Sequence, residues 1–165
     1  GDSLLNFVSK ELITTELGLE YTTWYHNDEF ASVSLWEIRE KFEFYDDVGV
    51  VIKPTDKKFK IYSLEGTFYF NQDIEKCYEE QKQRVIEFKE LFGNHVILDS
   101  WVARNPPPKH LKIIKHEDFK FDSGAELRII CYDTHEGSEK RKDTMYITIN
   151  SKEFNKFLEK YHTTN

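Results

Sequence analysis

Cys77 and Cys131 are the residues whose chemistry the sequence constrains most, because two cysteines permit only one intramolecular pairing. Cys77 lies on the apolar stripe of an expected helix, and Cys131 shares a strand face with Leu127 and Ile129. Two inward-facing thiols, one on a helix and one on a sheet, predict a disulfide across the core. A disulfide implies an oxidising compartment. The alternative is a pair of buried free thiols that pack as small apolar groups.

A candidate binding segment surrounds the prolines at 106–108, which Trp101 and Arg104 precede and Lys109 follows. Three consecutive prolines fix φ and remove three backbone donors, so this segment must be extended. An extended segment flanked by one aromatic and two cationic side chains suits docking against a partner or lining a cleft. We therefore predict a binding role for Trp101, Arg104 and Lys109. The alternative is a stiff connection between two strands.

Histidine and carboxylate groups supply the remaining chemistry, but none has the spacing of a catalytic or metal-binding motif. The six histidines, at positions 26, 95, 110, 116, 135 and 162, form no compact ligand set. Three groups of residues nevertheless place an imidazole beside carboxylates or bring carboxylates together: His26 with Asp28 and Glu29, His116 with Glu117 and Asp118, and Asp99 with Asp118 and Glu126. We expect no metal and no cofactor. An enzyme would need residues that converge only in the folded chain.

The charge pattern excludes one large class of partner. The 165 residues carry a net charge of −7, and Lys and Glu are interleaved along most of the chain. Nucleic-acid binding needs clustered cationic residues, so we expect no nucleic-acid partner. No apolar run reaches the 18 or more residues that a membrane span needs. The residue usage, rich in Lys, Glu, Ile and Asn and poor in Ala, is bacterial-like. The start at Gly1 without Met is interpreted as a processed terminus, a tag remnant or an excised segment, so a cleaved signal peptide is an alternative.

The elements that must position these residues include one local unit that occurs twice: an alternating strand, an Asn, and an amphipathic helix. The first copy runs through residues 66–71 into a helix at about 72–92, and the second runs through 144–150 into a helix at about 151–161. Asn71 and Asn150 are the expected N-caps of these helices. The repeat is explained either by duplication or by convergence, because any strand that feeds a helix favours this order.

Other segments complete an antiparallel sheet. We expect a first helix capped by Ser3 that fades at Thr14, and an ambiguous segment at 30–47 that we interpret as strand. Further strands are expected at 17–25, 48–53, 59–70 with a break near Gly66, 96–102, 111–114 and 126–133.

These elements predict an α+β fold, a mainly antiparallel sheet with two or three helices packed on it, as a single domain over residues 1–165. The cysteine pair, the acidic balance and the lack of catalytic motifs favour a secreted or periplasmic, non-catalytic binding domain whose partner is a protein. The first alternative is a carrier of a small apolar ligand, held in a pocket between helix and sheet. The second is an enzyme with no sequence-local motif.

Overall fold

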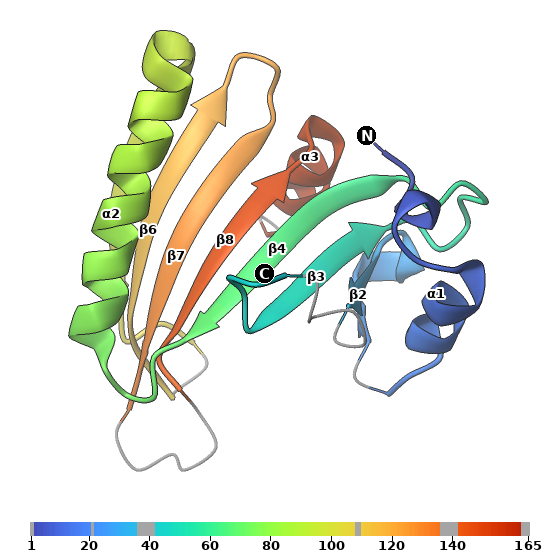
Figure 1. Ribbon diagram of the computed structural model, residues 1–165, viewed down its shortest axis with the longest axis horizontal. Helices are drawn as coiled ribbons and strands as arrows, with labels where there is room; N and C mark the ends of the chain where they lie inside the picture. Colours follow the sequence, from blue (N-terminus) through green and yellow to red (C-terminus); the bar gives the residue numbers. More distant parts are fainter. Residues whose placement is uncertain (1, 21, 36–41, 108–109, 136–141, 163–165) are drawn as a thin grey trace. The chain divides into compact units, whose positions relative to one another are not determined.

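An antiparallel sheet of eight strands and three α-helices make up the structure, a computed structural model that describes residues 2–20, 22–35, 42–107, 110–135 and 142–162 (Figure 1). The strand order is β1-β2-β3-β4-β8-β7-β6-β5. The predicted α+β class is therefore confirmed. The chain divides into two compact units: the first unit comprises the residues up to Gly66 and those from Asn150, and the second unit comprises Thr67–Ile149. The single-domain assignment stays a prediction.

The first unit has one helix on each face of its strands. Its elements are η1 (Leu4–Asn6), α1 (Lys10–Leu17), β1 (Thr23–Trp24), η2 (His26–Asp28), β2 (Ala31–Ser34), β3 (Asp47–Ile52), most of β4 (Ile61–Tyr69) and α3 (Lys152–His162). Alternation along β3 separates two cores. Val50 and Ile52 pack in the cluster that contains Ile13 of α1, whereas Val51 packs with Phe154 and Phe157 of α3.

The first helix begins later than the sequence predicted. Ser3 caps only the short η1, and the hydroxyl of Ser9 accepts a hydrogen bond from the backbone N–H of Leu12 to start α1. Thr14 does not end this helix, which continues to Leu17, and its hydroxyl donates to the carbonyl of Lys10 at 2.9 Å. The strand expected at 17–25 is accordingly reduced to Thr23–Trp24.

Two further strand predictions are confirmed only in part. Of the segment 30–47, β2 and the first residue of β3 are strand, and residues 36–41 lie outside the described part of the chain. β4 continues past Gly66 without a break. A Cβ at Gly66 would overlap the ring of Tyr45, so glycine permits this close approach rather than interrupting the strand.

The second unit packs one long helix on its strands (Figure 1). Its elements are the end of β4, α2 (Ile74–Phe92), η4 (Gly93–His95), β5 (Val96–Arg104), β6 (Leu111–Phe121), β7 (Glu126–Thr134) and most of β8 (Thr144–Asn150). The buried core shared by α2 and the sheet consists of Cys77, Val85, Phe119, Leu127, Ile129, Cys131, Met145 and Ile147. β6 is much longer than the predicted 111–114, because its polar residues 115–118 are also strand, paired with β5 on one side and with β7 on the other.

The helix caps of the repeated unit are not the predicted asparagines. Asp73 caps α2 by accepting from the backbone N–H of Lys76, and Asn71 lies two residues earlier with a left-handed φ of 48°. The hydroxyl of Ser151 accepts from the N–H of Phe154 at the start of α3. Asn150 instead belongs to β8 and accepts a hydrogen bond from the hydroxyl of Ser63 at 2.6 Å. Strand and helix therefore recur, but their junctions differ in chemistry.

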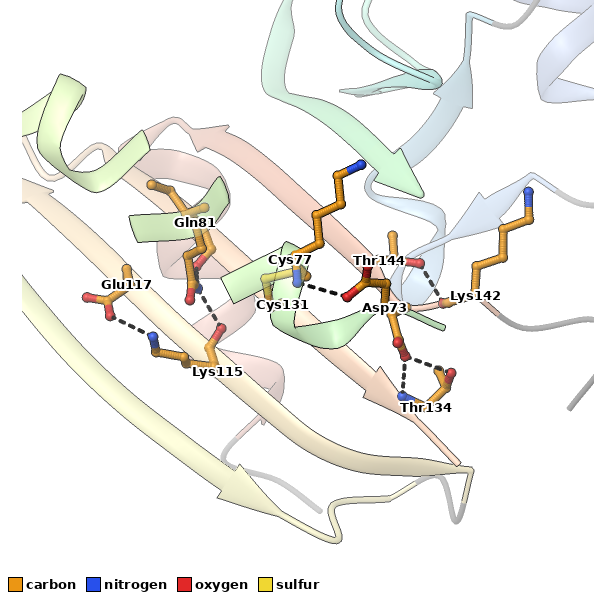
Figure 2. The surroundings of a disulfide bond; sticks show 12 residues. Asp73, Cys77, Gln81, Lys115, Glu117, Cys131, Thr134, Lys142 and Thr144 are labelled. Atoms are coloured by element: carbon orange, nitrogen blue, oxygen red, sulfur yellow. Dashed lines mark hydrogen bonds and ion pairs between the residues drawn. A yellow bond between two sulfur atoms is a disulfide. The ribbon is translucent and has the colours of Figure 1, made fainter. Parts of the chain in front are cut away.

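The predicted disulfide is confirmed: Cys77 of α2 and Cys131 of β7 are joined by a bond of 2.10 Å, with Cα atoms 6.2 Å apart (Figure 2). One helical turn further on, the amide nitrogen of Gln81 donates to the carbonyls of Lys115 and Ile129, at 3.0 and 2.9 Å. A covalent bond and two hydrogen bonds thus hold the N-terminal half of α2 against β6 and β7.

Candidate functional site

β5 lies at the end of the sheet order, so within the described residues only β6 lies beside it. All nine of its residues pair with β6 without a register shift. Three of its apolar side chains are nevertheless exposed to a large extent: Ile97 is 70% exposed, Val102 50% and Trp101 45%. Soluble proteins usually protect such an edge with proline, lysine, a bulge or a covering element. β5 contains no proline or lysine, and its charged residues are Asp99 and Arg104.

A hydrogen bond just after β5 shows which of its residues direct their backbone N–H and C=O groups toward β6. The N–H of Asn105 donates to the carbonyl of Lys112 at 2.8 Å. Because hydrogen-bonded pairs alternate along an antiparallel ladder, the odd-numbered residues of β5 direct their backbone groups to β6. The even-numbered residues direct theirs outward, away from the sheet. This outward set, which we call the β5 edge, consists of Val96, Leu98, Ser100, Val102 and Arg104.

Trp101 is held rigidly beside this edge. It lies opposite His116 of β6 in the strand register, and the two rings stack with centroids 3.6 Å apart and planes inclined by 12°. The indole Nε1 donates to Oδ2 of Asp118 at 3.0 Å. These two contacts fix both the plane and the rotation of the indole while almost half of the side chain stays exposed.

Asp118 and His116 are buried beneath Trp101, at 5% and 7% exposure. His116 Nδ1 and Asp118 Oδ1 face each other at 3.7 Å, too far for a hydrogen bond, and both atoms are buried without a hydrogen-bond partner. Burial raises the pKa of the Asp118 carboxyl, but His116, Trp101 and the guanidinium of Arg128 outweigh burial and hold that pKa below its ordinary value. Asp118 is therefore a carboxylate at neutral pH.

The three carboxylates Asp99, Asp118 and Glu126 do share one face, as the sequence suggested. Asp99 lies directly opposite Asp118, and Asp118 lies opposite Arg128 on β7. Each outer carboxylate has a cationic partner. Lys120 binds Asp99 at 2.8 Å, and Arg128 donates through Nε and Nη2 to Glu126. The face therefore carries paired charges rather than two carboxylates arranged for general acid–base catalysis.

The predicted binding set is separated by the fold. Trp101 and Arg104 differ by three positions on β5, so their side chains lie on opposite faces of the sheet. Lys109 lies outside the described residues. His116 and Asp118 are the partners of Trp101 that the sequence reasoning missed. His116 and Asp118 are two residues apart on a strand, and this spacing indicates from the sequence alone that they share one face. Only the register of β5 with β6 shows that Trp101 lies over them. The binding role of Trp101, Arg104 and Lys109 stays a prediction.

The fold keeps only part of each histidine cluster together: His116 stays beside Asp118, whereas other members point elsewhere. Within the second cluster, Glu117 points to the face opposite His116 and accepts a hydrogen bond from the hydroxyl of Ser100. In the first cluster, the His26 ring stacks on Tyr161 with centroids 4.1 Å apart, and Glu29 pairs with Lys53 at 3.1 Å. These imidazoles and their neighbouring carboxylates have packing and ion-pair roles.

A second polar cluster lies near the disulfide. Asp143 accepts from the backbone N–H and the hydroxyl of Thr134, at 2.9 and 3.0 Å, and thereby anchors the start of β8 to the end of β7. Burial raises the pKa of Asp133 above its ordinary value, although Lys112 opposes this shift. Burial, reinforced by Asp133, raises the pKa of Tyr78 to about 12. Tyr78 is therefore a neutral phenol at physiological pH.

Glu65 of β4 is the most perturbed carboxyl, and the sequence did not single it out. Burial, reinforced by the charge of Asp47, raises its pKa to about 7. Burial and the charge of Glu65 together raise the pKa of Tyr25 to about 12. Groups with strongly shifted pKa values mark candidate functional sites, but structural networks of charged groups also produce such shifts. Glu65 lies between Leu64 and Gly66, where the alternating pattern gave no sign of burial.

Comparison with known protein families, curated proteins and solved structures finds no match to this chain. No group of three or more His, Cys, Asp or Glu in the described residues is placed to hold a metal ion. The helices of the described ranges are too short or too polar to cross a membrane.

Proposed function

We propose that the chain is a non-catalytic, extracytoplasmic binding domain, and that it binds a protein partner by adding a strand of that partner to the β5 edge. The observation that carries this proposal is the exposed, largely apolar strand at the end of the sheet, with five residues whose backbone groups point outward. In strand addition, backbone hydrogen bonds supply affinity and the alternating side chains supply specificity.

Trp101 supports a role in recognition. Because its stacking on His116 and its hydrogen bond to Asp118 already fix the ring, a partner that contacts it loses little side-chain entropy. Tryptophan residues of this kind are enriched among those that dominate binding energy. A partner strand beside β5 would place its own side chains next to Trp101 on one face and next to Val102 on the other.

The disulfide supports an extracytoplasmic location. Stable disulfides persist in secreted and periplasmic proteins, whereas cytosolic thiols are kept reduced. Cys77 and Cys131 are fully buried and hold the helix that covers the core, which is the behaviour of a structural bond. The compartment itself is part of the proposal.

The carrier and the enzyme stay alternative predictions. A small apolar ligand would bind between helix and sheet, and an enzyme would act through side chains such as His116 and Asp118. Neither activity depends on the outward N–H of Val102. The variant Val102→Pro, which removes this N–H, therefore distinguishes both activities from strand addition.

The test selects ligands from a phage-displayed library of random peptides long enough to match the nine residues of β5. Synthetic copies of the enriched peptides are then titrated by fluorescence anisotropy against the wild type, Val102→Pro and Val102→Ala. Proline removes the outward N–H of residue 102 and no bond to β6, whereas alanine shortens the side chain and keeps that N–H. We expect affinity to fall by about tenfold or more with proline and by about threefold or less with alanine.

Circular dichroism and thermal unfolding establish that both variants fold. Peptides that bind the wild type and Val102→Pro equally well would contradict strand addition. A library from which no peptide is enriched would also contradict the proposal.

A further inference from the structure

We infer that the partner strand at the β5 edge is β5 of a second copy of this chain, paired antiparallel across a two-fold axis at Ser100. The inference rests on the proposed function, because it uses the same edge. β5 has nine residues, Val96–Arg104, and Ser100 is the central one. A two-fold axis perpendicular to the sheet at Ser100 therefore places Val96 opposite Arg104 of the second copy and pairs every residue of the strand.

The backbone phase of β5 permits this pairing. With the axis at Ser100, that residue and its counterpart form a hydrogen-bonded pair, which requires the N–H and C=O of Ser100 to point outward. They do point outward, because the bond from Asn105 to Lys112 fixes the odd-numbered residues toward β6. Val96, Leu98, Val102 and Arg104 then face outward as well, and each has a partner in the second copy.

A neighbouring register is poorer. An axis at Trp101 would bring Pro106 opposite Val96, at a position where each strand must donate an N–H. Proline has no N–H, and it follows Asn105, whose φ of 47° has already left the extended region. This register therefore loses pairing at both ends of the strand, whereas the axis at Ser100 uses all of it.

The side chains of the Ser100 register are compatible on both faces. On the face that α2 covers, Leu98 lies opposite Val102 of the second copy, and this apolar pair occurs twice by symmetry. On the other face, Ile97 lies opposite Ala103. Val102 and Ile97 are 50% and 70% exposed in the single chain, so pairing removes apolar surface from water where most of it is available.

The charges of the strand also tolerate self-pairing. Asp99 lies opposite Trp101 of the second copy, and Arg104 lies opposite Val96, so no like charges face each other. The charge of Asp99 is balanced within its own chain by Lys120 at 2.8 Å. A two-fold dimer is also the commonest form of protein self-association, and a strand that complements itself needs no other molecule to cover it.

Cysteine cross-linking reads the register directly. In the inferred dimer the two Ser100 residues form a hydrogen-bonded pair with Cα atoms about 5.5 Å apart, which is within the range that a disulfide spans. Each Val102 lies opposite Leu98, so the two Val102 residues are four positions out of register and about 13 Å apart. Ser100→Cys is therefore the probe, and Val102→Cys is the matched control on the same edge. Cys77 and Cys131 do not compete, because both are buried in their own disulfide.

Under mild oxidation we expect Ser100→Cys to form a covalent dimer about tenfold faster than Val102→Cys. In sedimentation velocity up to about 500 μM, the wild type and Val102→Ala should shift toward the dimer, and Val102→Pro should stay monomeric. A wild type that stays monomeric throughout would overturn the inference, as would equal cross-linking at the two positions. If the wild type is monomeric but binds selected peptides that Val102→Pro does not bind, the second-copy inference fails and strand addition stands. If neither the dimer nor peptide binding is seen, both fail.

Discussion

Cys77 and Cys131 join the first turn of α2 to the centre of β7, and neither side chain has any exposed surface. The bond closes a loop of 54 residues that contains β5 and β6. The disulfide also holds this helix and these strands together in the unfolded chain. It therefore lowers the conformational entropy of the unfolded state, and unfolding gains less entropy.

We expect the double variant Cys77→Ala/Cys131→Ala to lose about 4 kcal/mol of unfolding free energy, the amount that the chain-entropy treatment gives for a loop of this length. Urea unfolding followed by far-ultraviolet circular dichroism measures this loss, with the reduced wild type as the control. A loss below about 1 kcal/mol would show that the bond is not a principal source of stability.

Trp101→Phe tests the contact between the indole and Asp118. Phenylalanine keeps a ring over His116 but removes the Nε1 donor from a buried carboxylate. Loss of a hydrogen bond to a charged group costs about 1.5–3 kcal/mol. Because the indole is half-exposed and water can partly replace it, we expect Trp101→Phe to lower the unfolding free energy by about 1.5 kcal/mol at pH 7.

The pH dependence of Trp101→Phe has a definite sign. The pKa of Asp118 is lowered in the folded chain, so its stabilisation is present above the unfolded pKa of about 3.9 and is lost as the pH falls through the lower folded value. The difference between variant and wild type should therefore shrink below about pH 4. Trp24→Phe, at a tryptophan of similar exposure, is the control. Equal losses at pH 7 and pH 3 would argue against the Asp118 contact as the cause.

Sequence periodicity predicted the parts of the fold that depend on side-chain pattern. The inward stripe of α2 placed Cys77 in the core, and alternation on β7 placed Cys131 there, so their contact followed without knowledge of the strand order. Sequence periodicity did not predict which strands lie next to each other in the sheet. Trp101 could not be assigned to His116 and Asp118, because their contact depends on the register of β5 with β6. Burial of Glu65 likewise depends on how β4 packs within the first unit.

The helix starts show a finer limit. Asn, Asp and Ser are all good N-caps, and the sequence around residue 72 offers more than one of them. Asn71 instead occupies a left-handed turn, a conformation that Asn tolerates better than most residues, and leaves the cap to Asp73.

Asp73→Ala and Asn71→Gly distinguish these two roles. Removal of the carboxylate that accepts from Lys76 should cost about 1 kcal/mol. Glycine at position 71 suits the left-handed backbone, so Asn71→Gly should change stability by less than about 0.5 kcal/mol. Thermal and urea unfolding of both variants measure the difference. Comparable losses of unfolding free energy in the two variants would show that Asn71, and not Asp73 alone, caps α2.

Glu65→Gln should stabilise the chain above neutral pH. The pKa of Glu65 is raised from 4.5 to about 7 in the folded chain, because burial, reinforced by Asp47, disfavours the charged form. A raised carboxyl pKa means that the folded state holds its proton more tightly than the unfolded state, so stability falls as the pH rises from about 4.5 to about 7. A shift of this size corresponds to at most about 3.4 kcal/mol, and solvent screening at a partly exposed carboxyl reduces it to about 1–2 kcal/mol. Glutamine has no charge to bury, so the variant should exceed the wild type by that amount at pH 8 and match it at pH 4. Urea unfolding across this range measures the gain, and Glu90→Gln on the exposed face of α2 is the control. A gain that is the same at pH 4 and pH 8 would show that side-chain packing, and not the ionisation of Glu65, is responsible.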